Sequence, residues 1–355
     1  YSDYSFAPQQ NLVATCANGV VDLSSQLTAL GYIGTTTFTW YLSNNTPLSK
    51  NYMEEDGVFR FVAEPGTVVY CLMTNPAFPG LTLHTTNITI DAKATLPEPS
   101  FTFVSANTEG NLSFGADNGM STYIYIDWGD GVLVRGLVDA NEMIDNTTTS
   151  YIANNTVKVY ARGDVYMLDL KNQKVTALDV SKLTKLDYLN CSDNRLTTLD
   201  VSNNPELWAL NCSYNKLEAL DLSQNTLLEE LNCSGNSIGS IQLSANTALT
   251  SLDVSYNRLS YKTLPQVKAL YAANYNYSPQ DNLAATCTNG VVNLSEQRTI
   301  ADKDGVAQIT EYTWRETSGD WLIKGVDYLE QNGVFSFLQK PETTVYCIMA
   351  NAAFP

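Results

Sequence analysis

A 21-residue period dominates the middle of this chain and constrains its fold more than any other feature. The tripeptides Leu189-Asn190-Cys191, Leu210-Asn211-Cys212 and Leu231-Asn232-Cys233 recur at this step, and Leu252-Asp253-Val254 follows in phase. Leu186, Leu207, Leu228 and Leu249 keep the same spacing. A repeat of this length cannot bury its apolar face alone, so it stacks on its neighbours and leaves an extended concave sheet that faces solvent.

The repeat pattern predicts a leucine-rich repeat solenoid over residues 165–273. A second half-repeat also keeps the register, as in Leu199-Asp200-Val201-Ser202 and Leu220-Asp221-Leu222-Ser223. Val165 to Lys185 fits as a weaker first coil, and Val267 to Ala273 reads as a last, shortened strand. The total of about five coils exceeds the roughly three that a stable stack needs.

Two columns of residues inside the solenoid are predicted to be structural. Cys191, Cys212 and Cys233 occupy inward strand positions, where free cysteine packs as a small apolar side chain. A metal site is the weaker alternative, because no histidine accompanies the thiols. Asn194, Asn215, Asn236 and Asn257 are expected to satisfy backbone groups at the coil turns, and Asn204, Asn225 and Asn246 form a candidate second column. Asp179, Asp200 and Asp221 are expected to point outward and cap turns, with a cation site as the alternative.

The coil pattern resembles that of a known group of bacterial surface proteins. A 21-residue coil with Cys in a strand position and an L-D-V-S-x-N-x-x-L second half is similar to internalin J-type repeats and to leucine-rich surface proteins of Bacteroidetes. The resemblance covers about residues 165–265. It implies an extracellular or cell-surface location and an adhesive or ligand-binding role.

A longer repeat brackets the solenoid and predicts two small β-sandwiches, over residues 1–94 and 275–355. Asn11 to Cys16 matches Asn282 to Cys287, and Val69-Tyr70-Cys71 matches Val345-Tyr346-Cys347. Short alternating runs broken by Gly, Pro and Asn favour strands, and the Cys, Trp and late Tyr-Cys resemble immunoglobulin-like domains. Disulfides Cys16–Cys71 and Cys287–Cys347 are one interpretation of the paired cysteines, and buried free thiols are the other.

The second sandwich is expected to be incomplete. The first copy continues past Pro79 with an alternating stretch, Gly80 to Ile90, that reads as a closing strand, whereas the second copy reaches Phe354-Pro355. We therefore expect an unpaired sheet edge, or an edge that another chain pairs. The match of Tyr275 to Tyr4 also raises the expectation of another solenoid before Tyr1.

A third module is predicted over residues 97–161. The run from Tyr123 through Trp128-Gly129-Asp130-Gly131 resembles the W-x-x-G-D-G motif of PKD-like β-sandwich domains. Such a sandwich would cap the open end of the solenoid. Asp127, Asp130 and Asp139 are interpreted as part of a Gly-Asp-Gly hairpin turn, with calcium binding or catalysis as alternatives.

Composition argues against several classes of function. The net charge of −17 disfavours binding to nucleic acid or to anionic membranes. No apolar run reaches the length of a membrane-spanning helix. His84 is the only histidine and no nucleophile motif accompanies it, so we expect no enzyme, no cofactor and no metal. Because the chain starts at Tyr1 without Met or a signal peptide, we interpret it as a mature or a trimmed chain.

The leading hypothesis is a non-enzymatic extracellular adhesion protein, expected to be monomeric, that binds a host or bacterial surface protein or glycan. Strand alternation places the candidate ligand-binding residues on the concave face or at its edges. They are Tyr188, Asn190, Ser192, Trp208, Asn211, Ser213, Tyr214, Glu230, Asn232, Ser234, Asp253, Ser255 and Tyr256. A solvated sheet without a ligand, a structural stalk for a domain elsewhere, and an enzyme such as a glycosidase are the alternatives.

Overall fold

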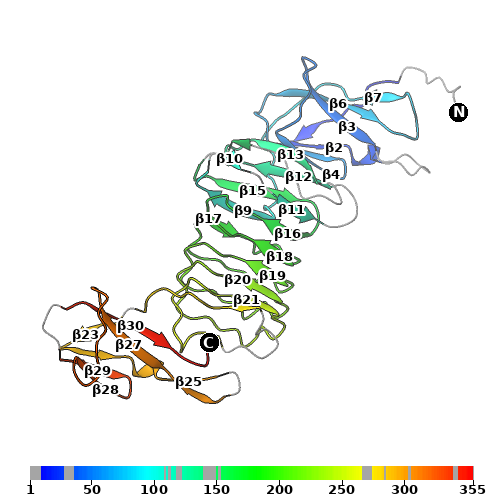
Figure 1. Cartoon of the computed structure of the whole chain (residues 1–355). Helices are drawn as coiled ribbons and strands as arrows, with labels where there is room; N and C mark the ends of the chain where they lie inside the picture. Colours follow the sequence, from blue (N-terminus) through cyan, green and yellow to red (C-terminus); the bar gives the residue numbers. More distant parts are fainter. Residues whose placement is uncertain are drawn as a thin grey trace. The chain divides into compact units, whose positions relative to one another are not determined.

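The computed structural model shows a mainly β protein with a leucine-rich repeat solenoid (Figure 1). It describes residues 9–27, 36–107, 109–110, 113–116, 122–138, 149–150, 153–265, 274–283, 285–302, 305–338 and 343–354. The chain divides into two compact units, Tyr1–Val165 and Tyr166–Pro355. The helices in the described part are the 3-10 turns η1 (Ser24–Gln26) and η3 (Ser295–Gln297).

The first unit begins with a two-sheet sandwich. One sheet has the order β1-β2-β5-β4, formed by β1 (Cys16–Ala17), β2 (Val20–Asp22), β5 (Val58–Phe61) and β4 (Tyr52–Glu55). The other contains β3 (Thr37–Leu42), β6 (Val68–Thr74), β7 (Thr82–His84) and β8 (Ile88–Thr89). Trp40 lies edge-on between Phe59 and Phe61, with ring centroids 5.0 and 4.9 Å away, and forms the centre of the core.

The second part of this unit, residues 97–161, is built around one antiparallel sheet. Its order is β13-β12-β15-β9, from β9 (Phe101–Ser105), β12 (Thr122–Asp127), β13 (Leu133–Val138) and β15 (Thr156–Ala161). β10 (Glu109–Gly110) pairs with β14 (Thr149–Ser150), and β11 (Ser113–Ala116) is a further strand. The sheet packs on the preceding sandwich through Met53, Tyr125 and Leu133, and the Tyr125 hydroxyl accepts a bond from Glu54 N (2.8 Å).

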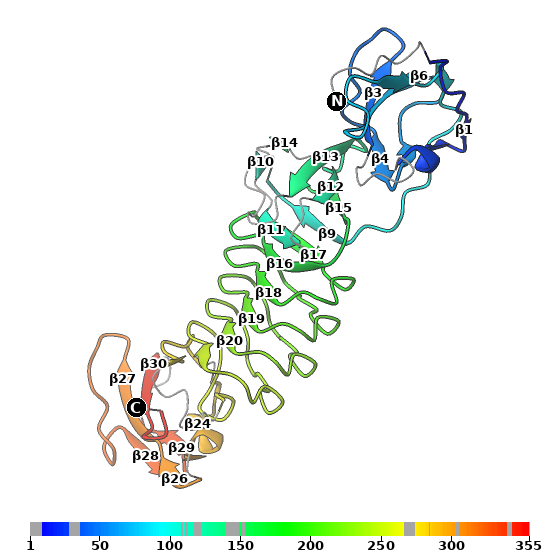
Figure 2. The same ribbon diagram turned by 90° about the vertical axis from the view of Figure 1, so that its right-hand side faces the viewer.

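The second unit contains the solenoid, whose coils stack in register (Figure 2). Its parallel sheet consists of β16 (Val165–Asp169), β18 (Tyr188–Asn190), β19 (Ala209–Asn211), β20 (Glu230–Asn232), β21 (Ser251–Asp253) and β22 (Tyr275–Asn276). A further strand, β17 (Val175–Asp179), follows β16 in the chain. Leu189 pairs with Leu210, and Leu231 with Leu252; all four are buried. The 21-residue period therefore becomes one continuous apolar core, as predicted.

The solenoid sheet extends beyond the boundary at residue 273 that the sequence suggested. Tyr275 pairs in parallel with Leu252, and Asn276 with Asp253. The expected strand over Val267–Ala273 falls outside the described residues. Two extra residues separate Asn276 from the 21-residue phase of Asp253, so the period alone does not predict β22.

The second unit also contains a sandwich that repeats the first. One sheet has the order β23-β24-β29-β28, from β23 (Cys287–Thr288), β24 (Val291–Asn293), β29 (Val334–Phe337) and β28 (Tyr328–Gln331). β25 (Thr299–Ala301) pairs with β26 (Ala307–Ile309), and β27 (Glu311–Glu316) with β30 (Val345–Ala350). Trp314 again lies edge-on between Phe335 and Phe337.

The disulfides considered for the two sandwiches do not form, and this interpretation is wrong. All seven cysteines are free thiols. Cys16 Sγ donates to Asp91 Oδ1 (3.2 Å), so the carboxylate holds this thiol, while Cys71 is fully buried in the apolar core. In the second copy Cys287 is exposed and Cys347 is half-buried.

Candidate binding surface on the solenoid sheet

A groove runs across the outward face of β18–β21 and continues to β22. It has a volume of about 490 Å³. We call it the sheet groove; its polar and aromatic lining residues are Tyr188, Asn211, Glu230, Asn232, Ser251, Asp253, Asn274, Tyr275 and Asn276. Glu230 and Asp253 are acidic and none of the lining residues is basic, so the groove suits a neutral or cationic ligand.

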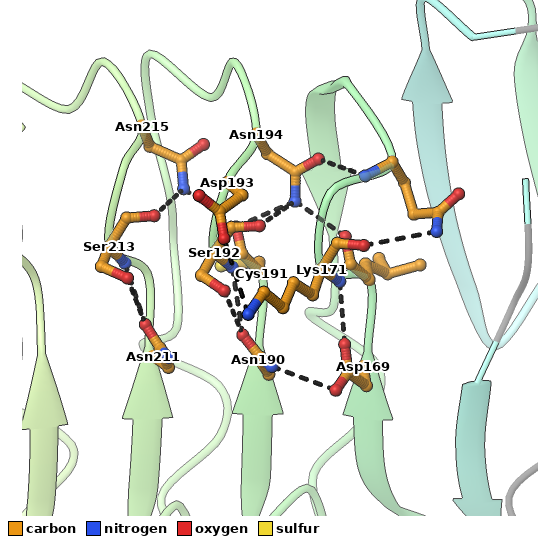
Figure 3. Close-up of polar contacts among 12 residues, drawn as sticks. Asp169, Lys171, Asn190, Cys191, Ser192, Asp193, Asn194, Asn211, Ser213 and Asn215 are labelled. Atoms are coloured by element: carbon orange, nitrogen blue, oxygen red, sulfur yellow. Dashed lines mark hydrogen bonds and ion pairs between the residues drawn. The ribbon is translucent and has the colours of Figure 1, made fainter. Parts of the chain in front are cut away.

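A row of carboxamide and carboxylate groups follows one strand position across this face. Asn190, Asn211, Asn232 and Asp253 occupy it, with Asp169 and Asn276 at either end. In each of the four central residues Oδ1 accepts two hydrogen bonds, from the backbone N and the hydroxyl of the Ser two positions later. Figure 3 shows this arrangement for Asn190 with Ser192 and Asn211 with Ser213.

These bonds show that four of the predicted ligand-binding residues are internal. Ser192, Ser213, Ser234 and Ser255 are all buried, which corrects their placement on the concave face. Their hydroxyls hold the neighbouring Oδ1 atoms at 2.6–2.7 Å. The strands end at Asn190, Asn211, Asn232 and Asp253, so alternation does not extend to the Ser positions.

The fixed oxygen determines where each amide nitrogen points. Asn190, also a predicted ligand-binding residue, is buried and does not line the groove, which corrects its placement; its Nδ2 donates to Asp169 Oδ2 (3.0 Å). Asn276 Nδ2 donates to Asp253 Oδ2 (3.1 Å) at the other end. Between them, Asn211 Nδ2 and Asn232 Nδ2 have no acceptor among the described residues. The centre of the groove therefore offers two oriented donors to a ligand.

Three aromatic residues of the predicted set, Trp208, Tyr214 and Tyr256, are exposed but do not line the sheet groove. Trp208 precedes β19 and is 40% exposed, with its ring centroid 6.4 Å from that of Tyr188. Tyr214 and Tyr256 follow β19 and β21 with positive φ values of 52° and 51°. Tyr188 is half-buried; burial first, and the charge of Asp169 second, raises the pKa of its hydroxyl. The phenol is therefore neutral at physiological pH and can donate.

The buried asparagine column gives the groove a rigid support, as expected from the sequence. Asn215 Nδ2 donates to the carbonyls of Cys191, Cys212 and Ser213, and its Oδ1 accepts from Leu196 N. Asn194, Asn236 and Asn257 make corresponding bonds. Asn204, Asn225 and Asn246 form the second column, each donating to a carbonyl of the preceding coil.

Gln280 extends the first column, and sequence reasoning missed it. Its side chain donates to Val254 O (2.9 Å) and accepts from Leu259 N (3.0 Å), as an asparagine does in the earlier coils. Gln280 lies 23 residues after Asn257 rather than 21. The same two-residue shift separates Asn276 from Asp253, so a search that allowed an insertion would have found both.

The cysteine ladder is confirmed as a set of buried thiols. Cys191, Cys212 and Cys233 are at most 1% exposed. Burial raises the pKa of all three thiols, that of Cys191 to about 12. They are therefore protonated and unreactive in the native solenoid.

The other polar residues considered from the sequence lie in turns. Asp179, Asp200 and Asp221 accept from the backbone N two residues later, and hydrogen bonds from the side chain and the backbone of that Ser lower the pKa of each carboxyl. Asp127 accepts from Gly129 N and Gly131 N, and Asp130 from Val132 N, as in a hairpin turn. Asp139 falls outside the described residues. Within the described part, no three His, Cys, Asp or Glu side chains gather as metal ligands would.

Comparison with known proteins found similarity to solved structures only. No protein-family model and no curated protein matches the chain. A structure described as the functional domain of InlJ from Listeria monocytogenes, which includes a cysteine ladder, is 29% identical with a TM-score of 0.30. The match covers 38% of this chain and 28% of the InlJ chain. None of the helices in the described residues is long and apolar enough to cross a membrane.

Proposed function

We propose that this chain is a non-enzymatic, extracellular binding protein whose sheet groove binds a neutral glycan. The observation that carries the proposal is the pair of Nδ2 donors on Asn211 and Asn232, each oriented by a Ser hydroxyl on the same amide's oxygen. Amide donors beside the carboxylate acceptors of Glu230 and Asp253 complement the alternating donors and acceptors of sugar hydroxyls. A protein ligand remains the other class, because exposed Trp and Tyr are also common interface anchors.

The aromatic residues supply the apolar part of the recognition. Tyr188 lines the groove, and the exposed Trp208 ring lies beside it, with ring centroids 6.4 Å apart and planes tilted by 50°. The C–H face of a sugar ring can pack on such a surface while its hydroxyls reach the amides. The absence of basic residues from the lining disfavours acidic glycans, because their carboxylates would face Glu230 and Asp253.

A glycan array separates this proposal from a purely structural stalk, which would bind nothing. The fluorescently labelled chain should be retained on a subset of neutral glycans and should be weaker on their sialylated forms. Trp208→Ala combined with Tyr214→Ala should reduce retention at least tenfold without unfolding the protein. Leu227→Ala is the matched control, since Leu227 is an exposed apolar solenoid residue without an aromatic ring. Equal loss in both variants would count against the groove as the binding surface.

A further inference from the structure

The first sandwich has a closing segment that the second lacks among its described residues. In the first sandwich β6 pairs with β3 on one edge and with β7 and β8 on the other. In the second, β30 pairs with β27 on one edge, and no described strand pairs with its other edge (Figure 1). The core shows the consequence. Val69, Cys71 and Met73 are buried, whereas their counterparts Val345, Cys347 and Met349 are only partly buried.

A groove of about 960 Å³ lies where that segment would pass. We call it the edge groove; its lining includes Cys287, Asn289, Gly290, Phe337, Val345 and Cys347. Each of these has a counterpart in the first sandwich that touches or binds the segment Thr85–Ala94. The first copy therefore serves as a template for what the edge groove accommodates.

The template makes backbone pairs along β6. Thr85 N donates to Cys71 O (3.0 Å), and Thr85 Oγ1 accepts from Cys71 N (3.0 Å). Ile88 pairs with Val69, and Ile88 and Ile90 fill the core with 3% and 0% exposure. The corresponding positions at the edge groove are Cys347 and Val345. No described residue fills the core position of either isoleucine in the second copy.

The template also contains a carboxylate subsite. Asp91 accepts from Asn18 N (2.9 Å), Gly19 N (2.8 Å) and Cys16 Sγ (3.2 Å). The matching groups are Asn289 N, Gly290 N and Cys287 Sγ, and the two backbone groups have no acceptor among the described residues. Asn289 and Gly290 have the same left-handed φ values (53° and 76°) as Asn18 and Gly19 (53° and 75°), so the donors are already arranged for a carboxylate.

The surroundings of the two glycines show that the space is open. A Cβ on Gly19 would lie 2.3 Å from Ala94 N, because the closing segment passes directly over it. A Cβ on Gly290 would meet only Phe337 O, at 3.4 Å. Leu283 gives a parallel contrast: it is 41% exposed, whereas its counterpart Leu12 donates to His84 O and accepts from Thr86 N.

One contact limits how much of the template can be reproduced. Tyr261 Oη, from the end of the solenoid, donates to Met349 O (2.8 Å). Met349 corresponds to Met73, which pairs with Leu83 of β7. The part of the edge that β7 would occupy is therefore already used, and the open part corresponds to Thr85–Ala94.

We propose that the edge groove binds an extended strand of a partner polypeptide with the spacing of Thr85, Ile88, Ile90 and Asp91. The threonine pairs with Cys347, the two isoleucines complete the core beside Val345 and Phe337, and the carboxylate binds Asn289 N and Gly290 N. The chemistry is strand addition to an open sheet edge, with side-chain pockets and one anion site that set the register.

The test uses the whole chain and a synthetic peptide with the sequence of Leu83–Ala94. Fluorescence anisotropy measures binding, and mass spectrometry follows the labelling of each cysteine by a thiol reagent. The peptide should bind and slow labelling of Cys287 and Cys347 at least tenfold, while Cys16 is unaffected. An Ile88→Asp, Ile90→Asp peptide should not bind, and an Asp91→Asn peptide should bind at least fivefold more weakly.

A variant of the chain shows where the peptide binds. Leu283→Asp should weaken peptide binding without lowering the melting temperature, because Leu283 is exposed. Val13→Asp, at a 77% exposed site of the first sandwich, is the matched control and should bind normally. The proposal would be overturned if the peptide did not bind, or if the isoleucine-substituted peptide bound equally well. It would also be overturned if self-association without peptide protected Cys287 and Cys347 from labelling.

Discussion

The side-chain amide of Asn215 donates to the carbonyl oxygen of Cys191 in the preceding coil, with an Nδ2–O distance of 2.9 Å. The same amide donates to Cys212 O and Ser213 O and accepts from Leu196 N. One buried residue thus joins two coils. Without it, buried backbone groups in both coils would lack partners, so the asparagine column should contribute strongly to solenoid stability.

Asn215→Ala should destabilise the protein by about 3 kcal/mol, because each buried polar group left without a partner costs about 1–3 kcal/mol. Urea unfolding followed by circular dichroism measures the effect. Asn203→Ala is the matched control, since Asn203 is exposed in the preceding coil, and it should change stability by less than about 0.5 kcal/mol. Similar losses in both variants would remove the special role of the column.

The thiols of Cys191, Cys212 and Cys233 should resist a thiol reagent in the native protein and react when denaturant is added. They are buried and protonated, whereas Cys287 is exposed and should react first. Mass spectrometry after timed quenching identifies each labelled cysteine. Rapid native labelling of Cys212 would mean that the ladder is not inside the solenoid.

The same thiols predict a loss of stability at alkaline pH. Their pKa is raised in the folded state above the ordinary value of 9.0, in Cys191 to about 12, so the unfolded chain releases protons first as pH rises. Their contribution is complete below pH 9 and declines above it, by at most about 1.4 kcal/mol per pH unit for each thiol. The Cys191→Ala, Cys212→Ala, Cys233→Ala variant should show a shallower decline between pH 9 and 10.5. An unchanged slope would contradict this assignment.

Gly235→Ala should displace the Tyr214 ring. Gly235 has φ +65°, and an added Cβ would lie 2.7 Å from Tyr214 Cδ1. A left-handed residue with a side chain costs about 1–2 kcal/mol, and Tyr214 fluorescence should respond as its ring moves. Gly239→Ala, with nothing within 4 Å and no positive φ, is the control and should be neutral. If Gly235→Ala is equally neutral, the ring does not pack on the glycine.

The solenoid was predictable because its period appears directly in the sequence. Leu189 and Leu210 repeat at the step that places them side by side, and the cysteine and asparagine columns follow from the same register. The end of the solenoid was harder, because the two-residue shift before Asn276 and Gln280 breaks the period. Periodicity locates equivalent positions but does not locate insertions.

The candidate site was predicted only in part. Asn211 and Asn232 lie on the exposed face where strand alternation places them, but Ser213 and Ser234 are buried, because the chain turns inward directly after a three-residue strand. The paired positions of Cys16 and Cys71 suggested a disulfide, yet the partner of Cys16 is Asp91, which is distant in sequence. Contacts of that kind depend on how two sheets meet, which neither composition nor spacing determines.

The most direct test of the sheet groove is glycan-array binding by Asn211→Asp. Asp253 occupies the same position and keeps both bonds to its Ser, at 3.0 and 2.6 Å, so aspartate at 211 should fold normally. The substitution replaces the open Nδ2 donor with an acceptor and, as Asp253 does with Asn276, should engage the neighbouring Asn232 amide. We expect Asn211→Asp to keep its melting temperature and to show at least tenfold weaker retention on neutral glycans. The control Asn203→Asp should be retained as strongly as the unsubstituted chain. The proposed role of the sheet groove would be contradicted if Asn211→Asp were retained as strongly as the unsubstituted chain, or if the unsubstituted chain were retained on no glycan.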